Sequence, residues 1–437
     1  MMNKLRKLVN QTLASYYLLQ LKKDQWKDSH QLKNIQFKKL KGIIKHAYNY
    51  VPYYHRLFSS AKIKPEDIKD QDDLRKIPLT TKQDIQKNYW DIVPRGIKAS
   101  RLPSSFTSGS TGVPLRIIFD YSHMSHHDAS TRYTWFECGV KLSDKFVTVW
   151  GRAQSVMRLR RYVKLMGNIT ETIAPLLPQE KLINVLRQIN PNVINTFPSV
   201  LSSLANYDIS GINPRLIFTQ GEVVTQHCRD IVRKMFNLEL LEIYGSVEFG
   251  HLAFECNEHC GLHMITDGAY IEFVDRNGEY VSPGEQGEII VTELYNRAMP
   301  LIRYRIGDVG IPTDEKCPCG RSWPLIKSIQ GRINDRVILP SGREISWLHF
   351  YHHFYKELEK NAFSISQYQI IQDQKNRITF KVVKGREFEP EMLERIKNNL
   401  EMYFAKLGEN VEVVTQVVKE IAGERTGKRR ILISKLN

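Results

Sequence analysis

The stretch Ser105-Phe-Thr-Ser-Gly-Ser-Thr-Gly-Val-Pro114 is the part of the sequence that says most about the fold. It places four hydroxyl side chains and two glycines between Phe106 and Pro114, ahead of an apolar run from Leu115 that predicts a β-strand. Glycine lets backbone N–H groups turn inward, and serine and threonine add hydroxyl donors. The stretch therefore predicts a loop that holds a polyphosphate, with a solvated Ser/Gly turn as the alternative. It differs from the G-x-x-x-x-G-K-[ST] loop because no lysine follows its second glycine.

Length and composition indicate a soluble globular protein of two or more domains. The chain has 437 residues, of which 42% are apolar and 25% charged, as in ordinary globular proteins. No run approaches the ~18 apolar residues of a membrane span. The segment 8–21 is interrupted by Asn10, Gln11 and Gln20, so it predicts an amphipathic helix with a basic face rather than a signal peptide. We therefore expect a cytoplasmic protein.

The net charge of +16 restricts the class of partner. The chain has neither a low-complexity basic arm nor a motif that reads nucleic acid, so we expect no nucleic-acid partner. Anionic substrates such as ATP are the simpler explanation. Contact with anionic lipid headgroups and a generally solvated basic surface stay open as alternatives.

Hydrophobic patterning divides the chain into segments of different character. Residues 1–60 predict an N-terminal helical segment. Between 145 and 250, short apolar runs alternate with amphipathic stretches, which predicts an α/β sheet with ligands at the strand carboxyl ends. The strands expected there are 146–150, 193–196, 216–219 and 240–244, and the helices are 201–207 and 231–236.

The C-terminal half predicts two further folding patterns. Strands at 269–274 and 288–292 around a turn at 275–278 predict a hairpin. Residues 337–437 predict a small α+β unit with strands at 378–382 and 411–414, a helix over 392–404 and a boundary near Asp335. The expected fold is α/β. Residues 61–334 are expected to form an N-terminal domain with α/β sheets and a hairpin-rich subdomain at about 254–320, and residues 335–437 a small α+β C-terminal domain.

Four segments downstream of the loop place a glycine beside a carboxylate or an aromatic ring at an expected strand end. They are Gly221-Glu222, Tyr244-Gly-Ser-Val-Glu248, the run 303–310 with Asp308, and Gly331-Arg-Ile-Asn-Asp335. An adenine can stack on Tyr244, a ribose diol can bond to Asp308, and Glu248 can hold Mg²⁺. Each segment alone could be a structural turn. The candidate nucleotide-binding residues are Thr107, Ser108, Gly109, Ser110, Thr111, Gly112, Gly221, Glu222, Tyr244, Gly245, Ser246, Asp308 and Arg332.

In this order the motifs resemble the adenylate-forming (AMP-binding) superfamily, and within it the phenylacetate–CoA ligase family with its capsular-polysaccharide-biosynthesis group. The family's phosphate loop matches 107–112, its Tyr-Gly-x-x-Glu motif matches Tyr244, Gly245 and Glu248, its ribose-binding aspartate matches Asp308, its hinge motif matches Gly331, Arg332 and Asp335, and its C-terminal catalytic lysine matches Lys428. Two positions depart from the pattern. Leu115 and Arg116 stand where many members have a lysine, and Val247 stands where many have Thr or Ser.

The resemblance implies an AMP-forming acid–thiol ligase. ATP would bind with Mg²⁺ held by Glu248, Lys428 would assist attack of an acid on the α-phosphorus, and the last domain would rotate about Asp335 for transfer to coenzyme A. The acid would be aromatic, with Trp150, Phe197 and Phe218 as pocket candidates, although each is better explained as a core residue. Two alternatives stay open: acyl or aminoacyl transfer to a sugar or amine in capsular polysaccharide biosynthesis, and a non-catalytic nucleotide-binding scaffold. Peripheral contact with membrane-bound polysaccharide machinery and a homodimer also stay open.

Two close cysteine pairs predict a structural zinc site. The segments Cys256-Asn-Glu-His-Cys260-Gly-Leu-His263 and Cys317-Pro-Cys319 supply soft ligands in tight turns. Four thiolates suit tetrahedral Zn²⁺, and so do three thiolates with one imidazole. Some relatives show a zinc pattern that Cys256, His263, Cys317 and Cys319 match, which leaves Cys260 as a substitute for His263. One metal would join the two ends of the hairpin subdomain, and unligated thiols are the alternative.

Overall fold

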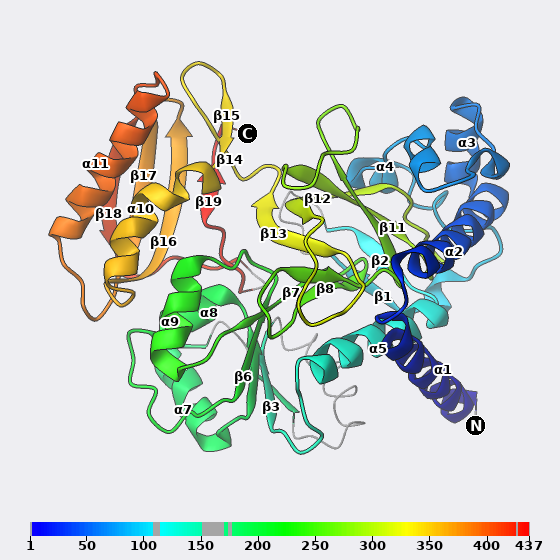
Figure 1. Cartoon of the computed structure of the whole chain (residues 1–437), viewed down its shortest axis with the longest axis horizontal. Helices are drawn as coiled ribbons and strands as arrows, with labels where there is room; N and C mark the ends of the chain where they lie inside the picture. Colours follow the sequence, from blue (N-terminus) through cyan, green and yellow to red (C-terminus); the bar gives the residue numbers. More distant parts are fainter. Residues whose placement is uncertain (1, 108–113, 151–169, 174–176, 425–426, 437) are drawn as a thin grey trace. The chain divides into compact units, whose positions relative to one another are not determined.

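The computed structural model describes residues 2–107, 114–150, 170–173, 177–424 and 427–436, which divide into two compact units (Figure 1). The first unit comprises residues 1–139 and 243–330, and the second comprises 140–242 and 331–437. Among the described residues, no helix combines the length and the apolar character needed to cross a membrane.

Helices occupy the start of the first unit, as the sequence predicted. They are α1 (Met2–Asp24), α2 (Ser29–Tyr50), α3 (Pro52–Ser60) and α4 (Lys82–Lys87), with 3-10 turns at Pro65–Asp67, Asp72–Lys76 and Ala99–Arg101. Asp28 caps α2 by accepting the N–H of Gln31 at 2.8 Å, which supplies a partner for one of the open N–H groups of the first turn. The helix α5 (Tyr121–Glu137) packs along α1, and the sequence patterning had not indicated it.

The sheet of the first unit has the strand order β10-β11-β12-β13-β9-β8-β7. Its strands are β7 (Leu241–Ser246), β8 (Gly250–Glu255), β9 (Leu262–Met264), β10 (Ala269–Val274), β11 (Gly287–Glu293), β12 (Tyr304–Thr313) and β13 (Leu325–Arg332). The expected hairpin is confirmed, because β10 and β11 pair antiparallel from Ala269↔Glu293 to Val274↔Glu288.

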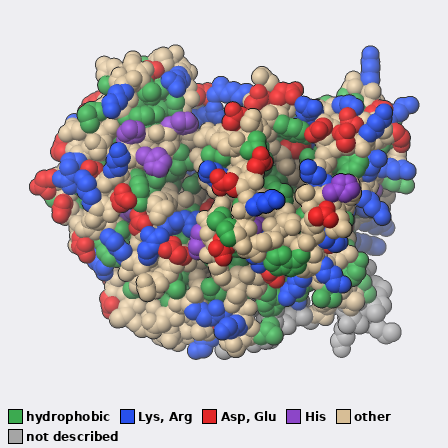
Figure 2. All heavy atoms as spheres, viewed as in Figure 1, with side chains coloured by type: hydrophobic (Ala, Val, Ile, Leu, Met, Phe, Trp, Pro, Cys, Tyr) green, Lys and Arg blue, Asp and Glu red, His purple; other side chains and the backbone are tan. Residues whose placement is uncertain are grey.

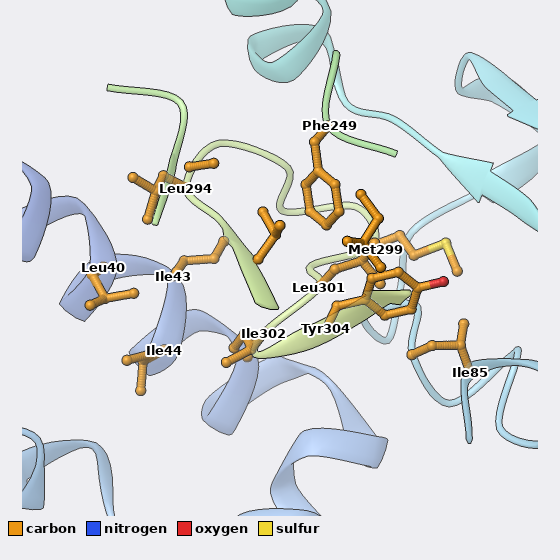
Figure 3. Packing of buried hydrophobic residues seen from close by; sticks show 14 of the residues in the cluster. Leu40, Ile43, Ile44, Ile85, Phe249, Leu294, Met299, Leu301, Ile302 and Tyr304 are labelled. Atoms are coloured by element: carbon orange, nitrogen blue, oxygen red, sulfur yellow. The ribbon is translucent and has the colours of Figure 1, made fainter. Parts of the chain in front are cut away.

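The core of the first unit joins the N-terminal helices to this sheet. Leu40 and Ile43 of α2 lie beside Leu294 and Ile302, and on the other side of the cluster Phe249 lies near Tyr304 (Figure 3). The ring centroids of Phe249 and Tyr304 are 6.1 Å apart. Burial of such side chains stabilises a fold by about 1.5–3 kcal/mol each. The core therefore fixes the turn just before Phe249 and the start of β12.

The second unit begins with a parallel sheet, as the βαβ pattern predicted. Its strand order is β6-β5-β3-β4, and all three pairings within it, β4–β3, β3–β5 and β5–β6, are parallel. The strands are β3 (Phe146–Val149), β4 (Thr170–Ile173), β5 (Val193–Thr196) and β6 (Leu216–Gln220), and the helices packed on them are α7 (Gln179–Ile189), α8 (Pro198–Leu204) and α9 (Gln226–Phe236).

The C-terminal part of the second unit is an α+β domain, which confirms the prediction for this region. A sheet of order β18-β17-β16-β19 carries the helices α10 and α11 (Figure 1). The elements are β14 (Arg336–Ile338), β15 (Glu344–Ser346), α10 (Leu348–Lys360), β16 (Ile365–Gln374), β17 (Arg377–Lys384), α11 (Glu391–Lys406), β18 (Glu412–Val418) and β19 (Leu432–Ser434).

The excess positive charge does not gather in one patch on the face shown in Figure 2, where Lys and Arg side chains alternate with Asp and Glu. A uniform basic field for nucleic acid is absent from that face.

Candidate active site

The two ends of the predicted phosphate loop are joined by hydrogen bonds. Strands β1 (Ser104–Phe106) and β2 (Arg116–Ile118) pair antiparallel. Next to this pair, the N–H of Thr107 donates to the carbonyl of Leu115 at 2.9 Å, and its Oγ1 accepts the N–H of Leu115 at 3.0 Å. Thr107 therefore joins the two ends of the loop through hydrogen bonds to Leu115. The remaining loop candidates, Ser108, Gly109, Ser110, Thr111 and Gly112, lie outside the described residues.

The structure brings the two residues expected around the nucleoside into direct contact. Tyr244 in β7 donates its phenol O–H to Oδ2 of Asp308 in β12 at 2.9 Å. Both residues are largely buried, with Asp308 8% exposed. Hydrogen bonds to an ionised carboxylate are stronger than neutral ones and fix its orientation. If Asp308 binds the ribose, its carboxylate would thus be oriented by the hydroxyl of Tyr244, the residue expected beside the adenine.

Glu248 lies in a tight turn between β7 and β8. Ser246 pairs with Gly250 across this turn, and Ser246 Oγ accepts the N–H of Phe249 at 3.3 Å. A β-carbon on Gly245 would lie 2.2 Å from the carbonyl oxygen of Gly250, so only glycine fits there. Glu248 is half-buried. The tight turn therefore fixes the backbone at Glu248, and its carboxylate is a suitable ligand for a hard cation such as Mg²⁺.

Lys428 lies next to Gly221, just after strand β6. A β-carbon built on Gly221 would be 3.1 Å from Cε and 3.2 Å from Nζ of Lys428, and 3.0 Å from Cη2 of Trp150. Gly221 also has φ +83°, a region that L-residues with side chains rarely adopt. Trp150 is half-buried and stacks on Phe197 with ring centroids 4.3 Å apart. Because Gly221 has no side chain, the side chains of Lys428 and Trp150 can approach its backbone.

Glu222 makes contacts that the sequence did not indicate. Its carboxylate accepts hydrogen bonds from Ser199 and from the backbone N–H of Arg429. Burial raises the pKa of Glu222, and the bonds from Arg429 and Ser199 act in the opposite direction. Ser199 and Arg429 belong to no recognised motif, so the sequence offered no signal for them.

The hinge motif contains an aspartate that forms an ion pair. Gly331 has φ +99°, and the N–H of Arg332 donates to Oδ2 of Asp335 at 3.4 Å. Arg430 Nη2 lies 2.5 Å from Oδ1 of Asp335. Burial raises the pKa of Asp335, and Arg430 opposes that rise.

Of the pocket candidates for an acid, two are core residues. Phe197 and Phe218 are 1% and 0% exposed. Trp150 is only partly buried, and it packs against the core cluster with its edge beside Gly221.

The four residues proposed as zinc ligands converge in the first unit. One ligand atom from each of Cys256, His263, Cys317 and Cys319 lies within 4.8 Å of the other three. Cys256 Sγ is 3.5 Å from Cys317 Sγ, and Cys319 Sγ is 3.3 Å from His263 Nε2. In a tetrahedral site with Zn²⁺–ligand distances of about 2.0–2.3 Å, the ligand atoms lie about as far from one another as these atoms do, so the donor set fits the ion. Cys260 is not in this group and donates its thiol to the carbonyl of Glu258 at 3.3 Å.

Comparisons with known proteins agree with this fold. Residues 104–295 match the family model described as AMP-binding enzyme, and residues 338–435 match that of the CapK C-terminal domain. The chain is 30% identical to the phenylacetate-coenzyme A ligase of Escherichia coli (strain K12) over 71% of this chain and 73% of that protein. It is 25% identical to Protein CapK of Staphylococcus aureus over 75% and 73%. A crystal structure of 2-hydroxyisobutyryl-CoA ligase in the postadenylation state superposes with a TM-score of 0.77, covering 94% of this chain and 91% of that chain at 17% identity, which shows the shared fold.

The fold and the order of the motifs are those of an adenylate-forming enzyme. The chain belongs to the phenylacetate–coenzyme A ligase family, whose members are AMP-forming acid–thiol ligases, and its C-terminal domain is of the CapK type. Acid adenylation followed by transfer to coenzyme A is therefore the chemistry that applies to this chain, with ATP and coenzyme A as the matching cosubstrates.

Proposed function

We propose that this enzyme activates an aromatic carboxylic acid with ATP and passes the acyl group to coenzyme A. The observation that carries the proposal is the position of Lys428, whose ammonium group lies against Gly221, with the edge of Trp150 beside the same glycine. A compact cation at this point suits a transition state in which an acid carboxylate approaches a phosphate. The flat, half-buried ring of Trp150 supports an aromatic acid.

The first half-reaction forms one bond and breaks another. A carboxylate oxygen of the acid attacks the α-phosphorus of ATP, and the bond to the β-phosphate oxygen breaks, so pyrophosphate leaves with its electron pair. Tyr244 and Asp308 would hold the nucleoside, and 107–112 the phosphates. Glu248 would hold the Mg²⁺ that neutralises charge on the phosphates.

The second half-reaction transfers the acyl group. The thiol sulfur of coenzyme A attacks the acyl carbon, the thiol proton is lost, and AMP leaves with the carboxyl oxygen that had joined it to the acid. Lys428 serves the first step, so we propose that the C-terminal domain rotates about Asp335 between the two. Transfer to a sugar or amine is the second candidate, which we keep because residues 338–435 match the CapK C-terminal domain.

Pyrophosphate exchange into ATP with a panel of carboxylic acids, phenylacetate among them, tests the proposal. We expect exchange with at least one aromatic acid, and loss of at least about a hundredfold in Lys428→Ala. Added coenzyme A should then give a thioester. Exchange without thioester would favour the sugar or amine acceptor, and absence of exchange with every acid would favour a nucleotide-binding scaffold.

We also propose a structural zinc ion at Cys256, His263, Cys317 and Cys319. It would join the segment after β8 to the loop before β13. The neighbouring Arg321 donates to Gln25 Oε1 and Glu137 Oε2, each at 2.7 Å, so this loop also contacts the C-terminal ends of α1 and α5. Protein purified without chelators should contain one zinc per chain.

A peripheral membrane contact through α1 is the remaining part of the proposal. Val9, Tyr16, Leu19 and the following Trp26 are between 53% and 60% exposed, although α1 buries its other face on α5. The last turn of α1 carries Lys22 and Lys23, and its first turn has no acid. An apolar strip with basic ends suits an anionic lipid surface.

Flotation with vesicles that contain phosphatidylglycerol tests this contact. Leu19→Glu should reduce binding, whereas Leu142→Glu, at an exposed leucine outside α1 that is 62% exposed, should not. A homodimer that dissociates in Leu19→Glu would instead assign the strip to a second copy.

A further inference from the structure

Glu222 uses its carboxylate to hold protein groups. Its Oε1 accepts the backbone N–H of Arg429 at 2.6 Å and the hydroxyl of Ser199 at 2.9 Å, and its Oε2 accepts the N–H of Ser199 at 2.9 Å. Three donors to the carboxylate of this half-buried residue form a strong and directional site. Two of them come from the start of α8, and the third comes from the residue that follows Lys428.

The two residues that follow Lys428 make several further contacts. Arg429 donates from Nη1 to the carbonyl of Ser199 at 3.2 Å and from Nε to the carbonyl of Ile421 at 2.9 Å. Arg430 pairs with Asp335, and its carbonyl accepts Nε2 of Gln369 at 2.9 Å. The backbone of 429–430 is therefore immobilised next to the lysine.

The proposed rotation of the C-terminal domain would break some of these hydrogen bonds and preserve others. Asp335, Gln369 and Arg430 all belong to the C-terminal part from 335 onward, so they move together. Glu222 and Ser199 lie before it, in the α8 and β6 region. Rotation about Asp335 must therefore break the bonds from Glu222 and Ser199 to Arg429 and can leave the Arg430–Asp335 pair intact.

We propose that Glu222 is a positioning residue that latches the Lys428 segment for adenylation and releases Arg429 before acyl transfer. This inference rests on the proposed function, because it assigns Lys428 to the first half-reaction. Glu222 acts through the backbone of Arg429 and does not touch the reacting atoms. Since Lys428 is adjacent in sequence, a fixed Arg429 N–H restricts where the lysine ammonium can lie.

Amide hydrogen exchange in the free full-length protein tests the latch without any substrate. In Glu222→Ala, exchange at the Arg429 amide should speed up by roughly tenfold to a hundredfold, which is the loss of one hydrogen bond to a charged acceptor. Glu222→Gln keeps an oxygen acceptor and should give a smaller increase. Unchanged protection of Arg429 in Glu222→Ala would overturn the proposal.

Glu409 provides a matched control within the C-terminal domain. It is a buried glutamate that accepts the N–H and the hydroxyl of Ser341, as Glu222 does with Ser199, yet it does not bond to Arg429. Glu409→Ala should leave the Arg429 amide protected. Equal acceleration in Glu222→Ala and Glu409→Ala would mean general loosening of the domain and would refute a latch.

The two half-reactions give the second readout. In Glu222→Ala, pyrophosphate exchange with an acid that the wild type accepts should fall roughly tenfold to a hundredfold. Thioester formation from the synthetic adenylate of the same acid and coenzyme A should fall clearly less than exchange does. An equal fall in both would make Glu222 merely structural and overturn the proposal. A wild type that exchanges with no acid, while the Arg429 amide still responds, would count against the proposed function and leave the latch supported.

Discussion

Replacing Gly221 by alanine should displace Lys428 without removing any functional group. The new β-carbon would lie 3.1 Å from Cε and 3.2 Å from Nζ of the lysine, and 3.0 Å from Trp150. Carbon atoms in ordinary contact are about 3.5–4.0 Å apart. The lysine end is the flexible partner, so it should retreat by about 0.5 Å or more.

The magnitude follows from two separate costs. A side chain at φ +83° strains the backbone by about 1–2 kcal/mol. The displaced ammonium adds a catalytic cost, because misplacement of a reacting group by about 1 Å can cost a hundredfold in rate. We therefore expect kcat for adenylation to fall roughly tenfold or more, with thioester formation from preformed adenylate largely retained.

Gly342 supplies the control for the backbone cost alone. It has φ +85°, and a β-carbon there would meet no atom within 4 Å. Gly342→Ala and Gly221→Ala should thus lose similar backbone stability in urea unfolding, but only Gly221→Ala should lose pyrophosphate exchange. Equal exchange rates in the two variants at saturating ATP would refute the placement of Lys428 beside Gly221.

Three further predictions concern other parts of the molecule. Tyr244→Phe removes the 2.9 Å bond to Asp308 and should raise KM for ATP about tenfold in steady-state assays; an unchanged KM would speak against a nucleoside site there. Cys319→Ser should lower zinc content and the melting temperature, whereas Cys260→Ser should change neither, as metal analysis and calorimetry can show. Burial lowers the pKa of His227 to about 4. Between about pH 6.5 and pH 4 the unfolded chain therefore carries a proton on this histidine and the folded chain does not, so the free energy of unfolding falls as the pH drops through this range. This loss is about 3 kcal/mol, and urea titrations of His227→Gln should show a flatter decline.

Local patterning predicted three of the four strands of the parallel sheet because burial on both faces of a strand leaves a continuous apolar run. The strands at 193–196 and 269–274 have the expected bounds. The helix α5 was missed because His126, Ser130 and Thr134 are buried in it, so it lacks an apolar stripe of period 3.6. Polar side chains buried by tertiary contacts give no helical signal in the sequence.

The candidate site was partly accessible from the sequence for a related reason. Motif order indicated Tyr244 and Asp308, because a tyrosine and an aspartate are residue types that suit nucleoside binding. Their mutual contact is long-range and could not be predicted. Spacing could not choose between Cys260 and His263, because both follow Cys256 closely. The choice depends on strand β9, which places His263 opposite Leu325 and next to the cysteine loop.

The basic run at the C-terminal end shows why composition alone misleads. Lys428, Arg429 and Arg430 in succession are typical of a solvated tail. In the structure the two arginines have other tasks: Arg429 bonds to carbonyl groups and offers its N–H to Glu222, and Arg430 pairs with Asp335. Their bonds fix the backbone on one side of Lys428, while Gly221 leaves room for its side chain. A cation that is held by its neighbours loses little entropy when a phosphate binds, so under the proposed mechanism the two arginines would prepare this lysine for catalysis.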